Sequence, residues 1–294
     1  MKFALHFGNF ACPDAADAGR LAQAAEAAGF ESVLAIEHVV WPTEYRSTYP
    51  YSATGRLPGG PESKLPDPLV WLTWVAALTR RLRLMTGVLI LPQRNPLVLA
   101  KEVATLDHLS GGRLSLGIGV GWLREEFEAL GVPFEARGRR ADEYIAAMRA
   151  LWAEDDASYD GEFVRFRGMS CNPKPVAGKV PIIVGGHSRL AVRRAARLGD
   201  GFFPATGAQV DVAPLIAEVR ELAVEAGRDP TAIEITTGCP GALPGADGDA
   251  LAAVAERAAA GVDRVALPIA AFLPDLEANL ARFGEDVIAR SGGR

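Results

Sequence analysis

Cysteine is scarce in this sequence, and long apolar runs are missing. The three cysteines, Cys12, Cys171 and Cys239, share no metal-ligand spacing. An odd, scattered number of thiols indicates a reduced, cytoplasmic protein rather than a disulfide scaffold. No run approaches the roughly 20 apolar residues that a membrane-spanning helix needs. The N-terminus turns polar after about a dozen residues, so we expect neither a signal peptide nor a membrane partner.

Excess basic charge and several familiar catalytic motifs are absent as well. The chain has 31 Lys and Arg against 36 Asp and Glu, a net charge of -5, which argues against a nucleic-acid partner because phosphate neutralisation needs clustered basic residues. Its four histidines form no HxH or HExxH pair, and no GxSxG motif occurs. We therefore expect no metal site, and neither a metal hydrolase nor a serine hydrolase is favoured.

A regular alternation of apolar strands and amphipathic helices runs through the 294 residues. Strands are predicted at 2–8, 31–38, 82–92, 113–121, 181–186, 201–205, 233–238 and 262–269. Helices are predicted at 14–29, 67–80, 95–112, 123–131, 139–153, 188–199, 211–227, 249–260 and 274–290. Nearly continuous apolar strands are typical of parallel sheets covered on both faces. The pattern predicts an α/β fold, a single (β/α)8 TIM barrel over residues 1–294. A doubly wound sheet, the alternative, would usually show a GxGxxG fingerprint after its first strand.

Two long segments interrupt the alternation. Residues 41–66, after the second strand, carry five prolines and four aromatic residues. A loop of this length without its own secondary structure is usually a lid or a binding loop. Residues 122–180, after the fourth strand, are predicted as a second insertion, in which 158–168 alternates like a small hairpin.

The carboxyl ends of barrel strands carry the chemistry of this fold. The second strand ends at Glu37 and His38, where His38 is a candidate acid/base and a buried structural histidine is the alternative. The fifth ends in the turn Gly185-Gly186-His187-Ser188, which opens a helix. Free amides, a hydroxyl and the positive helix end favour a phosphate site there, with an ordinary tight turn as the alternative. The sixth strand ends near Thr206.

The fourth strand has glycine at alternate positions, Gly117, Gly119 and Gly121, and then Trp122. Two compatible interpretations stay open, because small residues permit tight packing inside the barrel and also make room for a flat ligand. Gly87 lies within the third strand, where a glycine often marks a bulge or a close backbone approach by a ligand.

Several stretches resemble one family: AEAAGFESVLAIEH, TGVLILPQRNPLVLAKEVATLDHLSGGRLSLGIGVGWLREEFEALG, RGRRADEYIAAMRALW and VPIIVGGHSRLAVRRAARLGDGF. Together they resemble the bacterial luciferase-like flavin and deazaflavin enzymes, closely over about 1–205 and weakly over the last third. The chain length is most similar to the coenzyme F420-dependent oxidoreductases of that family.

The resemblance implies a flavin-like ring at the carboxyl ends of the strands. It implies a non-prolyl cis peptide at Gly87-Val88 behind the ring. The family's acid-histidine pair, usually Asp-His, is Glu37-His38 here. His38 would take the proton-transfer role, with Glu37 holding its tautomer or contacting the ring.

The remaining site residues follow partly from the same resemblance and partly from their places at the strand ends. The phosphate-binding turn matches Gly185, Gly186 and His187, with Ser188 beside them. Gly121 and Thr206 are expected at the cofactor, and Trp122 is expected to cap the substrate side. F420-dependent dehydrogenases carry a glutamate where this sequence has Trp122, which argues against a sugar-phosphate dehydrogenase.

We therefore predict an F420-dependent oxidoreductase that exchanges a hydride with a small organic substrate. An FMNH2-dependent monooxygenase, with FMN as cofactor and a separate reductase as partner, is one alternative. A non-catalytic flavin-binding protein is the other. The resemblance also implies a homodimer.

Overall fold

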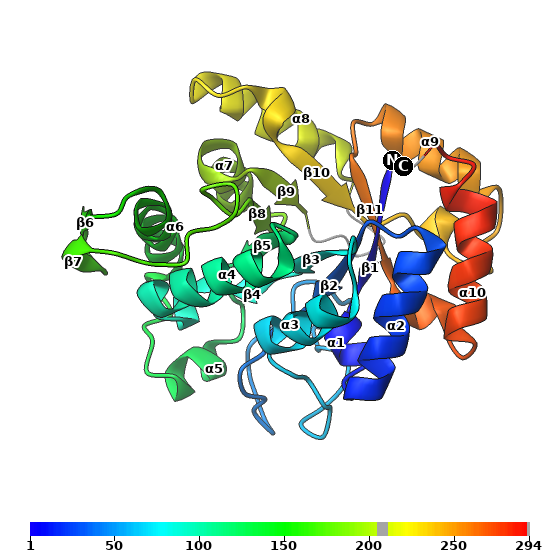
Figure 1. Ribbon diagram of the computed structural model, residues 1–294, viewed down its shortest axis with the longest axis horizontal. Coiled ribbons are helices and arrows are strands. Elements are labelled where there is room, and N and C mark those ends of the chain that lie inside the picture. Colours follow the sequence, from blue (N-terminus) through cyan, green and yellow to red (C-terminus); the bar gives the residue numbers. More distant parts are fainter. Residues whose placement is uncertain (205–210, 293–294) are drawn as a thin grey trace.

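The computed structural model describes residues 1–204 and 211–292. Its described strands include nine parallel segments that form one sheet in the order β3-β2-β1-β11-β10-β9-β8-β5-β4, which closes because β3 also pairs with β5 (Figure 1). The segments are β1 (Lys2–His6), β2 (Ser32–Ala35), β3 (Arg83–Thr86), β4 (Leu89–Ile90), β5 (Leu114–Gly119), β8 (Ile182–Gly185), β9 (Gly201–Phe203), β10 (Glu234–Thr237) and β11 (Arg264–Pro268). Because β3 and β4 both pair with β5, they share one strand position and the barrel has eight. The predicted (β/α)8 fold is therefore confirmed.

The third predicted strand, 82–92, is divided in two. The peptide bond between Gly87 and Val88 is cis, as the resemblance implied, and it separates β3 from β4. Both segments nevertheless pair with β5, Leu84 with Leu114 and Leu89 with Ile118. The chain therefore bulges near the carboxyl ends of the strands.

Helices cover the outside of the barrel (Figure 1). Asp67, Asn95 and Ser188 cap three of them by accepting backbone amides, which explains why the predicted starts were close. The α-helices are α1 (Gly8–Ala11), α2 (Ala15–Ala28), α3 (Pro68–Leu78), α4 (Pro96–Ser110), α5 (Arg124–Ala129), α6 (Arg137–Ala153), α7 (Arg189–Leu198), α8 (Ala213–Glu225), α9 (Ala250–Ala259) and α10 (Leu276–Phe283). Helix α1 is too short for a periodic signal and was not predicted, and the last predicted helix ends in a π-helical turn, Gly284–Ile288.

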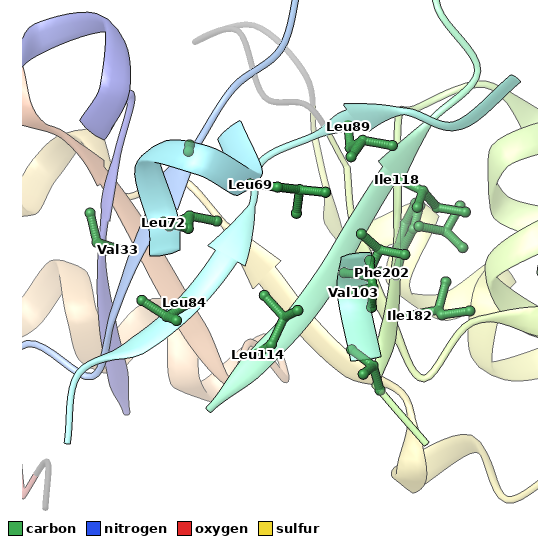
Figure 2. Packing of buried hydrophobic residues seen from close by; sticks show 14 of the residues in the cluster. Val33, Leu69, Leu72, Leu84, Leu89, Val103, Leu114, Ile118, Ile182 and Phe202 are labelled. Atoms are coloured by element: carbon green, nitrogen blue, oxygen red, sulfur yellow. The ribbon is translucent and has the colours of Figure 1, made fainter. Parts of the chain in front are cut away.

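Two apolar layers make the core. The larger lies between strands and helices: Figure 2 shows Leu69 and Leu72 of α3 near Leu84 of β3 and Leu114 of β5. The smaller lies inside the barrel and consists of six buried residues with Val88 packed against them: Ala4, Leu34, Met85, Ile183, Phe203 and Ala266. This inner layer fills the barrel below the site, so any ligand space must lie above it.

The two long segments differ in structure. Residues 41–66 form a loop of turns and bends without helix or strand. Within 122–180, α6 packs against α4 and touches α7, as expected of the helix of the fourth β/α unit. What is added there is α5 and an antiparallel hairpin of β6 (Ala157–Asp160) and β7 (Arg165–Met169), which projects away from the barrel in Figure 1.

A buried ion-pair cluster lies at the amino ends of the barrel strands. Arg264, 3% exposed, starts β11 and donates two hydrogen bonds of 2.9 Å to Glu31 and another to Glu234. Burial raises the pKa of Glu31, but the Arg264 guanidinium outweighs it, and the pKa lies below its usual value. The cluster joins the amino ends of β2, β10 and β11, which are far apart in the sequence.

Among the described residues, no helix is long and apolar enough to cross a membrane.

Candidate functional site

A cavity of about 1150 Å³ opens at the carboxyl ends of the strands. Ten of the predicted site residues line it: Glu37, His38, Gly87, Val88, Gly121, Trp122, Gly185, Gly186, His187 and Ser188. Thr206 lies outside the described residues. The strand ends therefore converge on one space, as expected of a barrel enzyme.

The bulge at Gly87-Val88 is fixed by hydrogen bonds on both sides. The Gly87 amide donates to the Ala35 carbonyl at 2.7 Å, and the Gly87 carbonyl lies 2.8 Å from Nε2 of His6. Burial lowers the pKa of His6 to about 4, so the ring is neutral at physiological pH and Nε2 carries the proton that it donates. His6 was missed from the sequence, although it ends the first strand and also lines the cavity.

The alternate glycines of β5 make room for this bulge. A Cβ on Gly117 would overlap the Thr86 carbonyl oxygen, and one on Gly119 would lie 2.8 Å from Cγ2 of Val88. Gly121 has a φ of 81° and packs against Ile90 and Phe127, where a Cβ would clash with both. Tight packing therefore accounts for all three glycines, and the bulged segment that they admit forms the cavity wall.

His38 is held by a carboxylate that the sequence analysis did not name. Its Nδ1 lies 3.0 Å from Oε2 of Glu126 in α5, and the two side chains are 7% and 0% exposed. The other oxygen of Glu126 accepts the Val39 amide at 2.6 Å. Since a carboxylate only accepts hydrogen bonds, Nδ1 of His38 is the donor in this contact, which leaves Nε2 as the ring nitrogen available to a ligand.

A sequence signal for Glu126 existed. It lies between Leu123 and Phe127, at the i, i+3, i+4 spacing of a buried helical face, and both neighbours are buried. A carboxylate on such a face needs a partner, because burying an unpaired charge is costly.

Glu37 does not hold the tautomer of His38, so that part of the expectation was wrong, whereas contact between Glu37 and the cofactor ring stays a prediction. Its carboxylate accepts the Ile90 amide and two hydrogen bonds from Arg94. Burial raises the pKa of Glu37, while Arg94 and the Ile90 amide oppose this by favouring the charged form. Arg94 also pairs with Asp67, the N-cap of α3. Glu37 therefore ties β4 to the helices from the edge of the cavity.

Trp41 of the 41–66 loop and Trp122 pack beside His38, and two tyrosines of the loop pack behind Trp122. The rings of Trp41 and Trp122 lie 5.8 and 5.7 Å from the His38 ring. Tyr45 and Tyr49 then contact Trp122 at 5.7 and 5.1 Å. The histidine thus faces a largely apolar wall that restricts water.

Helix α5 anchors the same loop through a second glutamate. Glu125 accepts the Arg46 amide at 2.6 Å and the Ser47 hydroxyl at 2.7 Å. Burial raises the pKa of Glu125, but these hydrogen bonds outweigh it and lower the pKa to about 2. Consecutive residues, Glu125 and Glu126, therefore fix the loop and the histidine together.

The predicted phosphate turn has free hydrogen-bonding groups. Gly186 has a φ of 107°, and its amide donates to the Phe203 carbonyl. The Ser188 hydroxyl caps α7 by accepting the Ala191 amide at 3.2 Å. The earlier amides of this ten-residue helix are left for a ligand. Nδ1 of His187 is buried without a hydrogen-bond partner among the described residues. An anion fits this set of donors.

Comparison with known proteins identifies the family. The sequence model of the luciferase-like monooxygenases matches residues 4–288.

The chain belongs to the luciferase-like monooxygenase family.

Some relatives of this luciferase-like chain have a named activity and others do not. An uncharacterized protein of Mycobacterium tuberculosis is 38% identical over 71% of the chain and 74% of its own length. An FMNH2-dependent dimethylsulfone monooxygenase of Pseudomonas fluorescens is 35% identical over 63% of the chain, which spans about half of that protein, 46%.

Two solved structures match almost the whole luciferase-like barrel. Monooxygenase RslO1 from Streptomyces bottropensis has a TM-score of 0.78 and 26% identity, with 99% of both chains covered. The coenzyme F420-dependent tetrahydromethanopterin reductase of Methanopyrus kandleri has the same TM-score, 0.78, at 17% identity, covering 98% of this chain and 99% of its own. The second likeness shows the fold alone.

In addition to the turn, four arginines line the cavity of this luciferase-like protein: Arg137, Arg139, Arg194 and Arg257. Arg194 is the most buried, with its side chain 8% exposed, and it pairs with Asp142. Arg137 donates to the Gly121 carbonyl at 3.1 Å. The described residues contain no cluster of metal-ligating side chains. The cavity thus combines four arginines from α6, α7 and α9, an aromatic wall and one oriented histidine.

Proposed function

We propose that this luciferase-like protein is an oxidoreductase that uses coenzyme F420 and a small organic substrate. The observation that carries the proposal is the placement of an oriented histidine and an anion turn on one cavity of about 1150 Å³. F420 has a flat three-ring head and a long tail with a phosphate and several carboxylates. Four arginines line the cavity, and although Arg194 is paired with Asp142, the other three support a tail with several negative charges over the single phosphate of FMN.

The residues present fit the cofactor. Val88 and the bulge form a backbone wall on which a flat ring can rest, and the inner apolar layer supports it from below. The turn at Gly186 and the start of α7 supply amides for the phosphate, and the Nδ1 atom of His187 still lacks a partner among the described residues. Val88 and the bulge would therefore hold the ring, and the arginines would hold the tail.

The chain's own part in the reaction is to orient groups and move a proton. When bound, F420 supplies the hydride carrier, because the cofactor provides the redox chemistry and the protein the electrostatics. Glu126 holds Nδ1 of His38, so Nε2 is the atom that gives or takes the proton of the substrate. Trp41 and Trp122 keep water away from the histidine. Trp122 also bounds the substrate side.

An FMNH2-dependent monooxygenase fed by a separate reductase is the second candidate. It is favoured by the names of the Pseudomonas fluorescens relative and of RslO1, both monooxygenases. This candidate predicts oxygen consumption and an oxygenated product, whereas the F420 reaction needs neither. The non-catalytic alternative is disfavoured because His38 retains an oriented, hydrogen-bonded ring. The homodimer stays a prediction, which light scattering in solution tests.

Titration of the purified protein with F420 and with FMN tests the proposal. We expect F420 to bind with a Kd well below about 0.1 mM and more tightly than FMN. Identification of any co-purified cofactor by absorbance and mass gives an independent answer. Tight FMN binding without F420 binding would favour the monooxygenase, and a folded protein that binds neither would refute both.

A further inference from the structure

Residues 48–51 and 57–58 of the 41–66 loop line the cavity. A chain of ring contacts connects its two sides: Trp122 to Tyr49 at 5.1 Å, Tyr49 to Tyr51 at 5.2 Å, and Tyr51 to His187 at 5.4 Å. Trp122 also contacts His38. The loop therefore links the proposed proton-transfer residue to the turn at the other end of the cavity.

Tyr51 stands directly over that turn. Its hydroxyl oxygen lies 4.0 Å from the position that a Cβ on Gly186 would occupy. The hydroxyl makes no hydrogen bond to any residue that the structure describes, whereas the Tyr45 hydroxyl accepts the Leu57 amide. Tyr51 is 36% exposed and lines the cavity. A phenol in this place is an available donor above the amides of the turn.

The ionisation of the phenols agrees with a donor role. Burial raises the pKa of Tyr51, and burial together with Tyr51 raises the pKa of Tyr49 to about 12. Both hydroxyls therefore keep their protons at physiological pH. A neutral phenol can donate to an anion, whereas a phenolate would repel it.

We propose that Tyr51 is a specificity-determining residue that donates a hydrogen bond from the loop to the cofactor phosphate seated on the Gly186 turn. The inference rests on the proposed function, in which the turn holds the phosphate of F420 or FMN. The phosphate is then enclosed between the amides at the start of α7 and the hydroxyl above it. Hydrogen bonds to ionised acceptors are about twice as strong as neutral ones, so this contact favours the closed loop only when a phosphate is present.

The ring contacts extend this effect to the substrate side. When Tyr51 is held over the turn, Tyr49 is held against Trp122, which contacts His38. A cofactor without phosphate leaves Tyr51 without its acceptor, and the loop is then less firmly closed. The loop thus distinguishes phosphorylated cofactors from their phosphate-free forms.

Substitution Tyr51→Phe in the full chain tests the inference, because it removes only the hydroxyl. The probes are FMN and riboflavin, and F420 and its phosphate-free deazaflavin chromophore, with Kd measured by fluorescence titration. We expect Tyr51→Phe to weaken binding of the phosphorylated forms about tenfold or more and to leave the phosphate-free forms unchanged. Tyr49→Phe is the matched control, since the ring of Tyr49 contacts Tyr51 and Trp122 and, among the described residues, its hydroxyl makes no hydrogen bond to the turn, so it should leave the ratio of the two affinities unchanged.

Limited trypsin digestion supplies a readout of loop closure. The loop carries Arg46, Arg56 and Lys64 as cleavage sites. A phosphorylated cofactor should protect them in the wild type and much less in Tyr51→Phe, whereas riboflavin should protect neither. If Tyr51→Phe keeps the wild-type ratio of affinities, the inference is wrong and the proposed function stands. If the wild type binds none of the four molecules, the proposed function fails and the inference fails with it.

Discussion

The carboxylate of Glu126 lies 3.0 Å from Nδ1 of His38, although 88 positions separate the two residues in the sequence. The glutamate is fully buried, and it also accepts the amides of Val39 and Val40. One side chain therefore orients the ring and the backbone that follows it. A histidine in such a contact has a fixed tautomer before any ligand arrives.

Replacement Glu126→Gln should lower turnover while leaving cofactor affinity nearly intact. The amide keeps the size of the carboxylate but can present a donor to Nδ1, which disturbs the tautomer of His38. We expect kcat to fall at least about 10-fold, and a loss of up to about 10⁴-fold is known where the carboxylate that orients an acid/base histidine is replaced by its amide. Glu125→Gln is the matched control, because Glu125 contacts Arg46 and Ser47 and not the histidine. Equal losses in both variants would contradict a specific role of Glu126.

Replacement His38→Ala should remove most of the turnover. A positioned acid/base contributes about 10²–10⁴-fold to the rate, and no other described side chain shares the contact with Glu126. Cofactor affinity should change little, since the turn at Gly186 and not His38 binds the phosphate in our proposal. His108→Ala, an exposed position on α4, is the control. Unchanged turnover in His38→Ala would exclude it as the acid/base.

The anchoring of the loop by Glu125 should depend on pH in a defined window. Its pKa in the folded protein, about 2, is below the value of about 4.5 expected in the unfolded chain. A lowered pKa contributes stability that is fully present above the unfolded value and is lost as the pH falls toward the folded one. The difference in unfolding free energy between wild type and Glu125→Gln should therefore be largest above about pH 5 and shrink toward pH 2.

Urea denaturation at pH 7 and pH 3 measures this window. We expect a difference on the order of 1–2 kcal/mol at pH 7, the usual contribution of hydrogen bonds to a charged group. If the difference in unfolding free energy between wild type and Glu125→Gln instead grows as the pH falls, the pKa of Glu125 is not lowered by folding.

The repeating pattern of the sequence was enough to predict the barrel, because each β/α unit carries its own local signal. Caps such as Asp67 and Asn95 also act within a few residues, so helix starts were predictable. Gly87 within the third strand indicated a bulge, but the cis peptide that divides the strand followed only from the resemblance.

Contacts across the barrel were not predictable in the same way. Glu37 and His38 are adjacent in the sequence and follow the end of β2, yet their side chains meet different elements. Glu37 binds Arg94, while His38 binds Glu126. The choice between the two explanations of the β5 glycines likewise depended on what lies beside β5, which only the structure supplies.

The ion-pair cluster at the foot of the barrel should contribute to stability and not to the chemistry. Arg264→Met leaves Glu31 and Glu234 together without their shared cation, so we expect a loss of about 3–5 kcal/mol. Cofactor affinity should not change, because the cluster lies at the amino ends of the strands. Chemical denaturation and cofactor titration of the same variant measure both quantities. Arg20→Met, which removes a mainly exposed pair with Asp17, is the control and should cost less than about 1 kcal/mol.

The packing of Gly119 against Val88 can be tested by a compensating pair. A Cβ at Gly119 would lie 2.8 Å from Cγ2 of Val88, so Gly119→Ala should destabilise the protein by about 1–3 kcal/mol, as overpacking usually does. Adding Val88→Ala removes the clashing methyl groups and should restore much of that loss. The double variant should still bind the cofactor less tightly, because Val88 lines the cavity at the bulge.

Gly117→Ala serves as the contrasting case. Its Cβ would overlap the backbone carbonyl oxygen of Thr86, which no side-chain substitution can move away. Val88→Ala should therefore fail to rescue Gly117→Ala, whose loss of stability should exceed that of Gly119→Ala. Thermal or chemical unfolding of the four variants, two single glycine changes and two doubles, decides the matter. If Val88→Ala restores the stability of both Gly117→Ala and Gly119→Ala, the backbone of β5 must shift to relieve the clash, and the contact with the Val88 side chain is not its specific cause.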